Sequence, residues 1–370
     1  MERIFKLCNG DRLTCTEQAA VFQFSGPRMV LSTGASGGGM RDDLTAAFNY
    51  CDCGMAGVCQ PMQGNNLWEH QRAVARCLGL DPDHTTGLDT AANLDNMVVI
   101  NKRWEDLQIT AAVSGGADVN ALCAGDPAFL TETDDAPTPV PPGTINIFLI
   151  TDRPLAPGAM AELMLTATEA KTAVLRDLMQ GSSVSRELAT GTGTDGMVII
   201  CGTGREGMLL NAGKHFKFGE LAALAVREAV TEALFRQTGL CAQEQHTVLR
   251  RLHRFGITAD TLSAHCLTQW QGQDTAIAKT IKKLDQDAFL VGAVVLYVHL
   301  EDQRRAGMLT ELEAGDWGEQ LLRQIQQHYR CDLPLLQEVG LMDKLENFLC
   351  QLFLTNLREQ ERLYPDQAPI

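Results

Sequence analysis

The stretch ATGTGTDGMVIICGTGREGM, residues 189–208, combines residue types that could bind phosphate or carry out acyl chemistry. It contains the pattern G-x-G-x-x-G twice, beginning at Gly191 and at Gly202. A dinucleotide fingerprint needs a strand before its glycines and a helix opening on them, so that backbone N–H groups meet pyrophosphate. The first copy follows a predicted helix and precedes a strand, and the second runs into no clear helix. We therefore expect no dinucleotide site here.

The first copy is better described as alternating glycine and threonine ending in Asp195. Glycines let backbone approach a ligand and present N–H groups, threonines add hydroxyls, and the aspartate adds a charge. Such a loop could form an oxyanion hole, a nucleophile or a cradle for a polar ligand. The alternative is an ordinary tight turn before a buried strand.

A helix predicted from about Pro157 to Gly181 carries two further candidates. At 100° per residue Lys171 falls within its apolar stripe, whereas Glu169 projects from nearly the opposite side. Lysine is unusual on a core-facing stripe. Either its ammonium has a function there, or its long stem carries the charge out to solvent.

Composition excludes some classes of function. A formal net charge of −15 disfavours a general nucleic-acid binder and suits a cationic or neutral small molecule. The longest apolar run, residues 288–300, is shorter than the roughly 20 residues that span a bilayer, so we expect no membrane partner.

Cysteine usage suggests a reducing cytoplasm, because 12 cysteines are scattered without regular pairing and the first residues lack a secretion-signal layout. The densest group, CDCGMAGVC (51–59), could suggest a soft-metal site. It lacks the paired knuckles of structural zinc, and we expect buried thiols.

The strands and helices predicted along the chain indicate an α/β fold with a mixed β-sheet core flanked by helices. Short strands with turns fill residues 3–32, and apolar runs predict four further strands near 96–101, 107–114, 144–150 and 197–202. The segment 40–50, after the glycine run 34–39, is compatible with a helix, and a helix is predicted from about 217 to 237. Residues 241–370 read as an all-α C-terminal extension, so we expect domains at 1–240 and 241–370.

Several blocks, in order, resemble the adenosylcobinamide amidohydrolase family over about residues 28–239. They are LSTGASGGG, TTGLDTAANLDN, ITAAVSGGADVNALCAG, INIFLITDRPLAPGAMAELMLTATEAKTAVLRDL, ATGTGTDGMVII and NAGKHFKFGELAALAV. The resemblance implies hydrolysis of the amide that joins the aminopropanol arm to the corrin ring of adenosylcobinamide. The products would be adenosylcobyric acid and 1-amino-2-propanol, as in cobamide salvage or remodelling, with a small-molecule corrinoid as the partner.

Amide hydrolysis needs an activated nucleophile, a stabilised oxyanion and a proton for the leaving amine. The matching blocks predict a metal-free site in which Asp195 and His215 orient or activate a hydroxyl or water. Lys171 assists by charge or proton transfer, and glycine N–H groups of residues 191–196 hold the oxyanion. The predicted catalytic residues are Asp195, His215, Lys171, Glu169 and Thr194. No cofactor is predicted, although a divalent metal on Glu169 and Asp195 is an alternative, and His215 is alternatively a solvated residue before a helix.

Other residues of the blocks are assigned to substrate contact, because their amides, hydroxyls and backbone suit the amide-rich rim of a corrin. They are Ser36, Gly37, Gly38, Asn49, Asn120, Asn146, Thr190, Gly191, Thr192 and Gly193. The asparagines could instead cap turns at strand ends.

Two other functions remain open at this point. One is a corrinoid-binding or sensing module that does not hydrolyse, with the helical extension docking a partner. The other is an amidohydrolase with a different amide substrate. The extension could equally form a homo-oligomer through its apolar faces.

Overall fold

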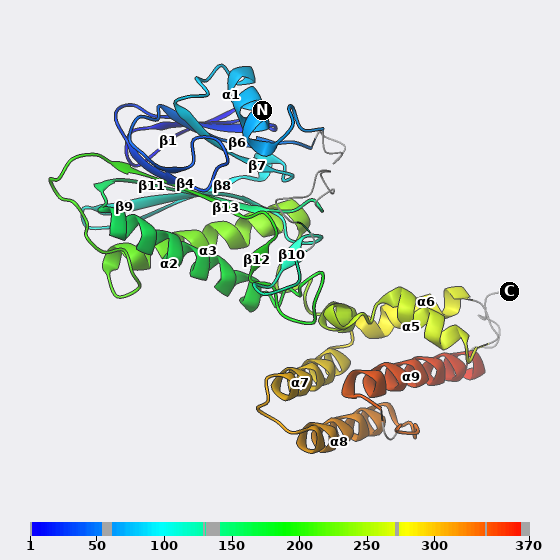
Figure 1. Ribbon diagram of the computed structural model, residues 1–370. Coiled ribbons are helices and arrows are strands. Elements are labelled where there is room, and N and C mark those ends of the chain that lie inside the picture. The colour runs from blue at the N-terminus through cyan, green and yellow to red at the C-terminus, as the bar shows by residue number, and fades with distance from the viewer. Residues whose placement is uncertain are drawn as a thin grey trace. The chain divides into compact units, whose positions relative to one another are not determined.

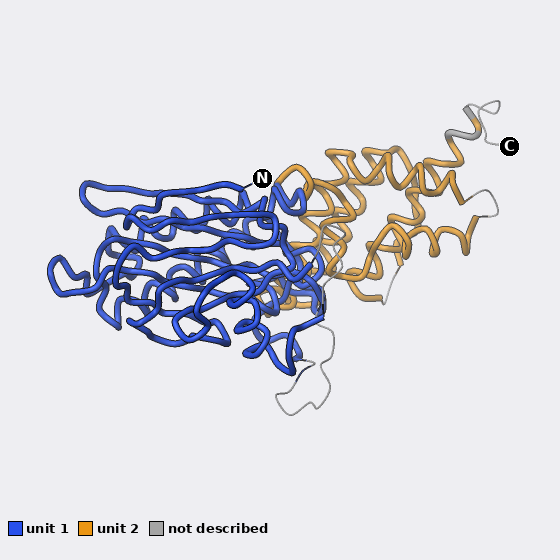
Figure 2. The backbone as a smooth tube through the Cα atoms, turned by 90° about the horizontal axis from the view of Figure 1, so that it is seen from above, with its two compact units in different colours: residues 1–241 blue, residues 242–370 orange. Residues whose placement is uncertain are grey.

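The computed structural model describes residues 2–363 apart from 54–60, 129, 131–140, 271–273 and 337–338. The chain divides into two compact units, Met1–Cys241 and Ala242–Ile370, coloured separately in Figure 2.

The first unit is built of four layers (Figure 1). Helix α1 covers a five-stranded sheet of order β1-β2-β3-β6-β7, which faces a six-stranded sheet of order β5-β4-β13-β11-β9-β8, and helices α2 and α3 cover the far side. The strands of the first sheet are β1 (Arg3–Lys6), β2 (Arg12–Cys15), β3 (Ala19–Gln23), β6 (Ala46–Cys51) and β7 (Thr85–Thr90). Those of the second are β4 (Met29–Ser32), β5 (Gly39–Arg41), β8 (Val98–Trp104), β9 (Leu107–Gly115), β11 (Ile145–Pro154) and β13 (Gly196–Gly202).

Both sheets are mixed, which confirms the predicted α/β class. Strand β6 runs parallel to β7, and β11 runs parallel to β13, whereas the other pairs within these two sheets are antiparallel. The β1–β2 turn uses Gly10 at φ 86°, a conformation that glycine adopts without strain. A separate short pair joins β10 (Ala121–Leu122) to β12 (Gly191–Thr192).

The helix considered for residues 40–50 is wrong, because that segment forms β5 and β6. Strand β6 pairs with β3 on one side and β7 on the other, and five of its six residues are buried. Tertiary pairing of a central strand outweighs the weak helix propensity of a short segment.

Two apolar cores hold the layers together. Between the sheets Phe22 stacks on Phe148 with ring centroids 4.3 Å apart, and Val198 and Ile200 lie in the same cluster. A larger cluster fills the space between the six-stranded sheet and helices α2 (Pro157–Asp177) and α3 (Lys217–Thr238).

The helix predictions hold for α2 and α3. Pro157 stands at the start of α2, and α3 ends at Gly239, which adopts the left-handed conformation at φ 76°. Helix α1 (Leu67–Cys77) was not predicted. It begins at Asn66, whose side chain accepts from the Glu69 N–H, and it buries His70, Gln71, Val74 and Ala75 against the five-stranded sheet.

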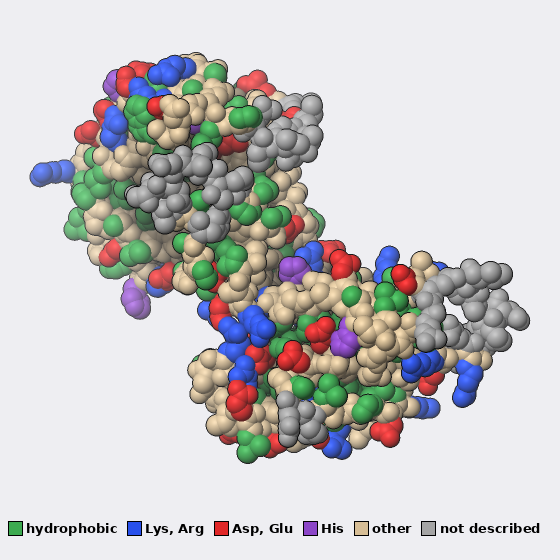
Figure 3. Space-filling view, turned by 45° about the vertical axis from the view of Figure 1, so that its right-hand side comes forward, with side chains coloured by type: hydrophobic (Ala, Val, Ile, Leu, Met, Phe, Trp, Pro, Cys, Tyr) green, Lys and Arg blue, Asp and Glu red, His purple; other side chains and the backbone are tan. Residues whose placement is uncertain are grey.

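The second unit is helical in all its described elements, as predicted. It contains α4 (Val248–Leu252), α5 (Ala259–Leu267), α6 (Asp274–Asp285), α7 (Ala288–Arg305), α8 (Glu311–Tyr329) and α9 (Leu341–Leu363). Helix α5 was missed from the sequence. Acidic and basic side chains are interspersed on its visible surface (Figure 3), and no described helix combines the length and apolarity needed to cross a bilayer.

The close approach of Phe48 to β7 gives the first prediction. A Cβ built on Gly87 would lie 2.0 Å from the Phe48 Cζ atom, so Gly87→Ala overpacks the layer between α1 and the sheet. We expect a loss of about 1–3 kcal/mol in the free energy of unfolding, measured by urea denaturation. Gly158→Ala is the control, because its Cβ meets no atom within 4 Å. Equal stability of the two variants would contradict the packing argument.

Candidate functional site

Polar side chains gather where the strands of the two facing sheets begin or end at one edge of the first unit. In the six-stranded sheet Asn146, near the start of β11, is in register with Gly196 at the start of β13 and with Ser114 near the end of β9. The Asn146 amide Nδ2 donates across the sandwich to Asn49 Oδ1 at 2.9 Å. These contacts bring segments far apart in the sequence to one edge.

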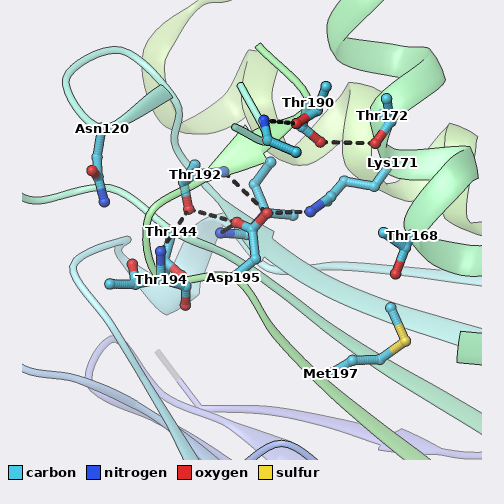
Figure 4. Close-up of polar contacts among 12 residues, drawn as sticks. Asn120, Thr144, Thr168, Lys171, Thr172, Thr190, Thr192, Thr194, Asp195 and Met197 are labelled. Carbon is cyan, nitrogen blue, oxygen red and sulfur yellow. Dashed lines mark hydrogen bonds and ion pairs between the residues drawn. The ribbon is translucent and has the colours of Figure 1, made fainter. Parts of the chain in front are cut away.

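Lys171 and Asp195 form a largely buried ion pair beside this edge (Figure 4). Their side chains are 9% and 17% exposed. The Lys171 stem does not carry its ammonium to solvent, since the ammonium donates to Asp195 Oδ2. The apolar stripe of α2 therefore places a cation against residues 190–195, the glycine–threonine loop.

The Asp195 carboxylate is saturated by donors from the protein. Oδ1 accepts from the Ile145 N–H at 3.0 Å and from the Thr192 hydroxyl at 2.5 Å, while Oδ2 accepts from the Thr192 N–H at 3.0 Å and from Lys171. A carboxylate offers about four acceptor positions, and all are used here. Asp195 therefore anchors the loop to the start of β11 instead of presenting a free oxygen.

The other polar groups of the loop are also engaged. Thr190 Oγ1 accepts from the Ala124 N–H, and the Thr194 hydroxyl donates to the Gly143 carbonyl. Asn120 Nδ2 donates to that same carbonyl at 2.8 Å. These bonds tie the loop to two neighbouring segments and leave Thr194 exposed at its tip.

Backbone groups of the loop face inward as well. The Gly193 N–H donates to the Asn120 carbonyl, and the Thr192 N–H donates to Asp195, so neither is directed at a ligand's oxyanion. A Cβ on Gly191 would lie 2.3 Å from Asp195 Oδ2, which explains glycine at that position. The loop is thus a rigid scaffold around the ion pair.

Glu169 and His215 lie elsewhere. Glu169 pairs with Lys214, and both side chains are more than half exposed. His215 is exposed, and no hydrogen bond or ion pair found in the described part of the chain joins it to Asp195 or Lys171. Glu169 and Asp195, the alternative metal ligands, bind different lysines, Lys214 and Lys171.

The glycine run 34–39 packs against the beginning of β7. Gly37, at φ 68°, lies so close to β7 that a Cβ on it would be 2.3 Å from the Thr85 carbonyl oxygen. A Cβ on Gly38 would be 2.0 Å from the Gly34 carbonyl oxygen. Ser36 is buried, and its N–H donates to Gln71 Oε1 at 2.7 Å. Gln71 of α1 then donates through Nε2 to Asp89 Oδ2 at 2.6 Å, so the loop is linked to a carboxyl group.

A buried chain of amides crosses from this region to the other sheet. Asn49 Nδ2 donates to Ser114 Oγ at 2.7 Å, and Asn146 Nδ2 donates both to Asn49 Oδ1 and to the Asp89 backbone carbonyl. Asn49 and Asn146 are at most 1% exposed. Their Nδ2 groups thus bind within the protein, whereas Asn146 Oδ1 is buried and finds no hydrogen-bond partner within the described ranges.

Asp52, His70 and Asp89 form a cluster that sequence reasoning missed. His70 Nε2 lies 2.9 Å from Asp52 Oδ1 and 3.6 Å from Asp89 Oδ1. The His70 side chain is 4% exposed, while those of Asp89 and Asp52 are 13% and 26% exposed. Two signals point to single members of the cluster: Asp89 stands in a block that carries the family resemblance, and residues 67–77 have the apolar spacing of an amphipathic helix with His70 on its buried face.

Burial and mutual charge shift the protonation of this cluster. Burial raises the pKa of Asp89 to about 6, against the opposing effect of the Gln71 donor. The hydrogen bond to Asp52 raises the pKa of His70. Asp89 Oδ1 is buried and accepts no hydrogen bond from the described part of the chain. The cluster therefore contains a carboxyl that exchanges a proton near neutral pH and has an unused oxygen.

The three side chains are also the one group of His, Cys, Asp or Glu residues, within the described ranges, whose ligand atoms converge within 4.8 Å. A metal on His70 Nε2 would need the ring proton on Nδ1, and metal-bound histidines donate that proton to an acceptor. Here Nδ1 instead accepts from the Gln63 N–H at 2.9 Å. The ring environment therefore favours a proton on Nε2 over a metal.

The cysteine prediction is confirmed in part. Cys51 is a buried free thiol, whereas Cys53 is disulfide-bonded, so the thiol prediction is wrong for Cys53. Cys59 lies outside the described residues.

The buried ion pair gives a second prediction. Lys171→Met removes the cation but leaves the Asp195 carboxylate in place, and we expect about 3 kcal/mol lower free energy of unfolding. Lys214→Met, which breaks an exposed pair, should change it by less than about 1 kcal/mol. Urea denaturation of both variants measures the difference, and a similar small effect in each would show that Lys171 is solvated.

The raised pKa of Asp89 gives a third prediction. Because its pKa is higher in the folded chain, the folded state binds more protons between about pH 4 and pH 6, and the Asp89 contribution to stability falls as pH rises through that window. Asp89→Asn removes this penalty. Relative to wild type, the variant should gain about 2 kcal/mol in unfolding free energy between about pH 4.5 and about pH 8. A difference between the two proteins that is independent of pH would show an unshifted carboxyl.

Comparison with known proteins agrees with the extent of the first unit. A family described as adenosylcobinamide amidohydrolase matches residues 4–242. An uncharacterized protein of Methanocaldococcus jannaschii, MJ1613, is 36% identical over 184 residues, which cover 47% of this chain and 71% of the relative.

Proposed function

The chain belongs to the adenosylcobinamide amidohydrolase family, and we propose that it hydrolyses the amide between the aminopropanol arm and the corrin ring of adenosylcobinamide. The observation that carries this proposal is the family match over residues 4–242, which covers almost all of the first unit, Met1–Cys241. All the buried polar clusters described above lie within that range.

The proposed reaction adds water to a secondary amide and releases adenosylcobyric acid and 1-amino-2-propanol. Its place is in salvage or remodelling of cobamides, where the acid is rebuilt with another arm. The reaction needs a group that accepts a proton from water and a route by which a proton reaches the leaving nitrogen. Carboxyl groups and an imidazole at one edge of the sandwich support that chemistry.

The residues predicted from the sequence take different parts in this proposal. Asp195 and Lys171 act as positioning residues, since their pairing shapes the glycine–threonine loop. Gly193 and Thr194 are the exposed part of the loop and are assigned to substrate contact. Glu169 and His215 are left outside the chemistry, because Glu169 binds Lys214 at the surface and His215 lies exposed beside it.

The charge of the chain is consistent with a corrinoid substrate. The cobalt centre gives such a molecule positive charge, and a formal net charge of −15 attracts cations at long range. The uncharged amides around a corrin suit a site built from hydrogen-bonding groups.

The fourth prediction tests the reaction itself. The purified full chain is incubated with adenosylcobinamide, and the products are separated by chromatography and identified by mass. We expect adenosylcobyric acid and 1-amino-2-propanol in equal amounts, with many turnovers for each protein molecule.

Cobinamide analogues with a different amide arm serve as the comparison for substrate specificity. Tight corrinoid binding without release of amine, with and without added divalent ions, would contradict hydrolysis and favour a non-catalytic binding or sensing module.

A further inference from the structure

We propose that Asp89 is the general base of this hydrolysis, and that His70 and Asp52 are the residues that position it. The proposal rests on the proposed function and extends it to a cluster beneath α1, apart from the glycine–threonine loop.

The two oxygens of Asp89 have different surroundings. Oδ2 accepts from Gln71 Nε2 at 2.6 Å, which holds the carboxyl plane, while Oδ1 is buried and has no hydrogen-bond partner among the residues that the structure describes. A buried carboxylate oxygen without a hydrogen bond is unfavourable, and proteins retain such groups where a ligand or a reaction uses them. Oδ1 is therefore the atom available to take a proton from water.

His70 supplies a fixed N–H beside that atom. Its Nδ1 accepts from the Gln63 N–H, so the neutral ring carries its proton on Nε2 and donates it to Asp52 at 2.9 Å. The same Nε2 lies 3.6 Å from Asp89 Oδ1. Because the ring is almost fully buried against the sheet, its orientation is set by packing as well as by these bonds.

The cluster is not sealed from solvent along its whole extent, since the side chains of Asp52 and Asp89 are 26% and 13% exposed. The backbone of Asp89 is held by the six-stranded sheet, since its carbonyl accepts from Asn146 Nδ2 of β11. A catalytic carboxyl needs this combination of fixed position and partial access.

The step balances with water as the one co-reactant. Asp89 takes a proton from water as the water oxygen forms a bond to the amide carbon, and the carbonyl becomes an oxyanion. The carbon–nitrogen bond then breaks while the proton on Asp89 passes to the leaving nitrogen. Amine and acid are released, and after loss of the acid proton the products are a carboxylate and an ammonium ion.

The titratable groups facing Asp89 are Asp52, which follows β6, and His70 of α1, with Tyr50 of β6 next to them. Burial and the Asp52 charge both raise the pKa of Asp89, to about 6. A base must be unprotonated to act, so kcat/KM should rise with pH through about 6 and level off above it.

The fifth prediction uses Asp89→Asn in the full chain. We expect kcat to fall by about 10²–10⁴-fold, with corrinoid binding, followed by visible absorbance, unchanged. Asp106→Asn is the matched control, because it makes the same chemical change on an exposed carboxylate in the β8–β9 turn. It should retain the wild-type kcat and pH profile.

His70 is tested with two substitutions. His70→Ala should lower kcat and displace the midpoint of the pH profile, because the Nε2–H beside Asp89 is lost. His70→Gln returns an N–H near that place and should restore part of both. Circular dichroism and urea denaturation establish that each variant is folded.

Three results would overturn the assignment. They are wild-type turnover by Asp89→Asn, a wild-type pH profile in His70→Ala, and an activity that requires a divalent ion which Asp89→Asn no longer binds. Failure of the wild-type chain to release 1-amino-2-propanol would instead contradict the proposed function, so the two failures are distinguishable.

Discussion

The first two residues of β11 form the hydrogen bonds that hold together the polar side chains at one edge of the first unit. The Ile145 N–H binds the Asp195 carboxylate, and the Asn146 side chain binds Asn49 and the Asp89 carbonyl. One strand start thus fixes the loop around Lys171 and Asp195 as well as the backbone of Asp89. Since β11 pairs with β9 and β13 and is buried along most of its length, these positions are held by the central part of the sheet.

The two clusters illustrate opposite ways of burying charge. Asp195 is surrounded by four donors, including a lysine, and burial of a charge is tolerated when its hydrogen bonds are complete. Among the described residues Asp89 has one donor on Oδ2 and none on Oδ1, so its ionised form is disfavoured. The donors around Asp195 stabilise a loop. The surroundings of Asp89 lower stability but raise the pKa of its carboxyl, and shifted pKa values of this kind are typical of active sites.

At several points of the first unit a glycine allows two elements to pack closely. Gly87 makes room for the Phe48 ring beneath α1, Gly191 for the ion pair, and Gly37 for the backbone of β7. At each of these positions a side chain would collide with the neighbouring element, so glycine allows the close approach.

The sequence by itself determined the elements with strong local signals: the apolar strands β8, β9, β11 and β13, the helices bounded by Pro157 and Gly239, the helical C-terminal region, and Lys171 on a core-facing stripe. It also carried the family resemblance. It did not reveal β6, β7 or α1, because β6 owes its conformation to pairing with β3 and β7, and the amphipathic spacing of α1 extends over a short segment. Nor could it reveal that Asp52, His70 and Asp89 converge, since contacts between residues 18 to 37 positions apart depend on how β6, α1 and β7 pack. Only the tertiary structure decided that Asp195 is saturated while Asp89 Oδ1 has no donor in the part of the chain that the structure describes, because hydrogen-bond completeness depends on every neighbour in space.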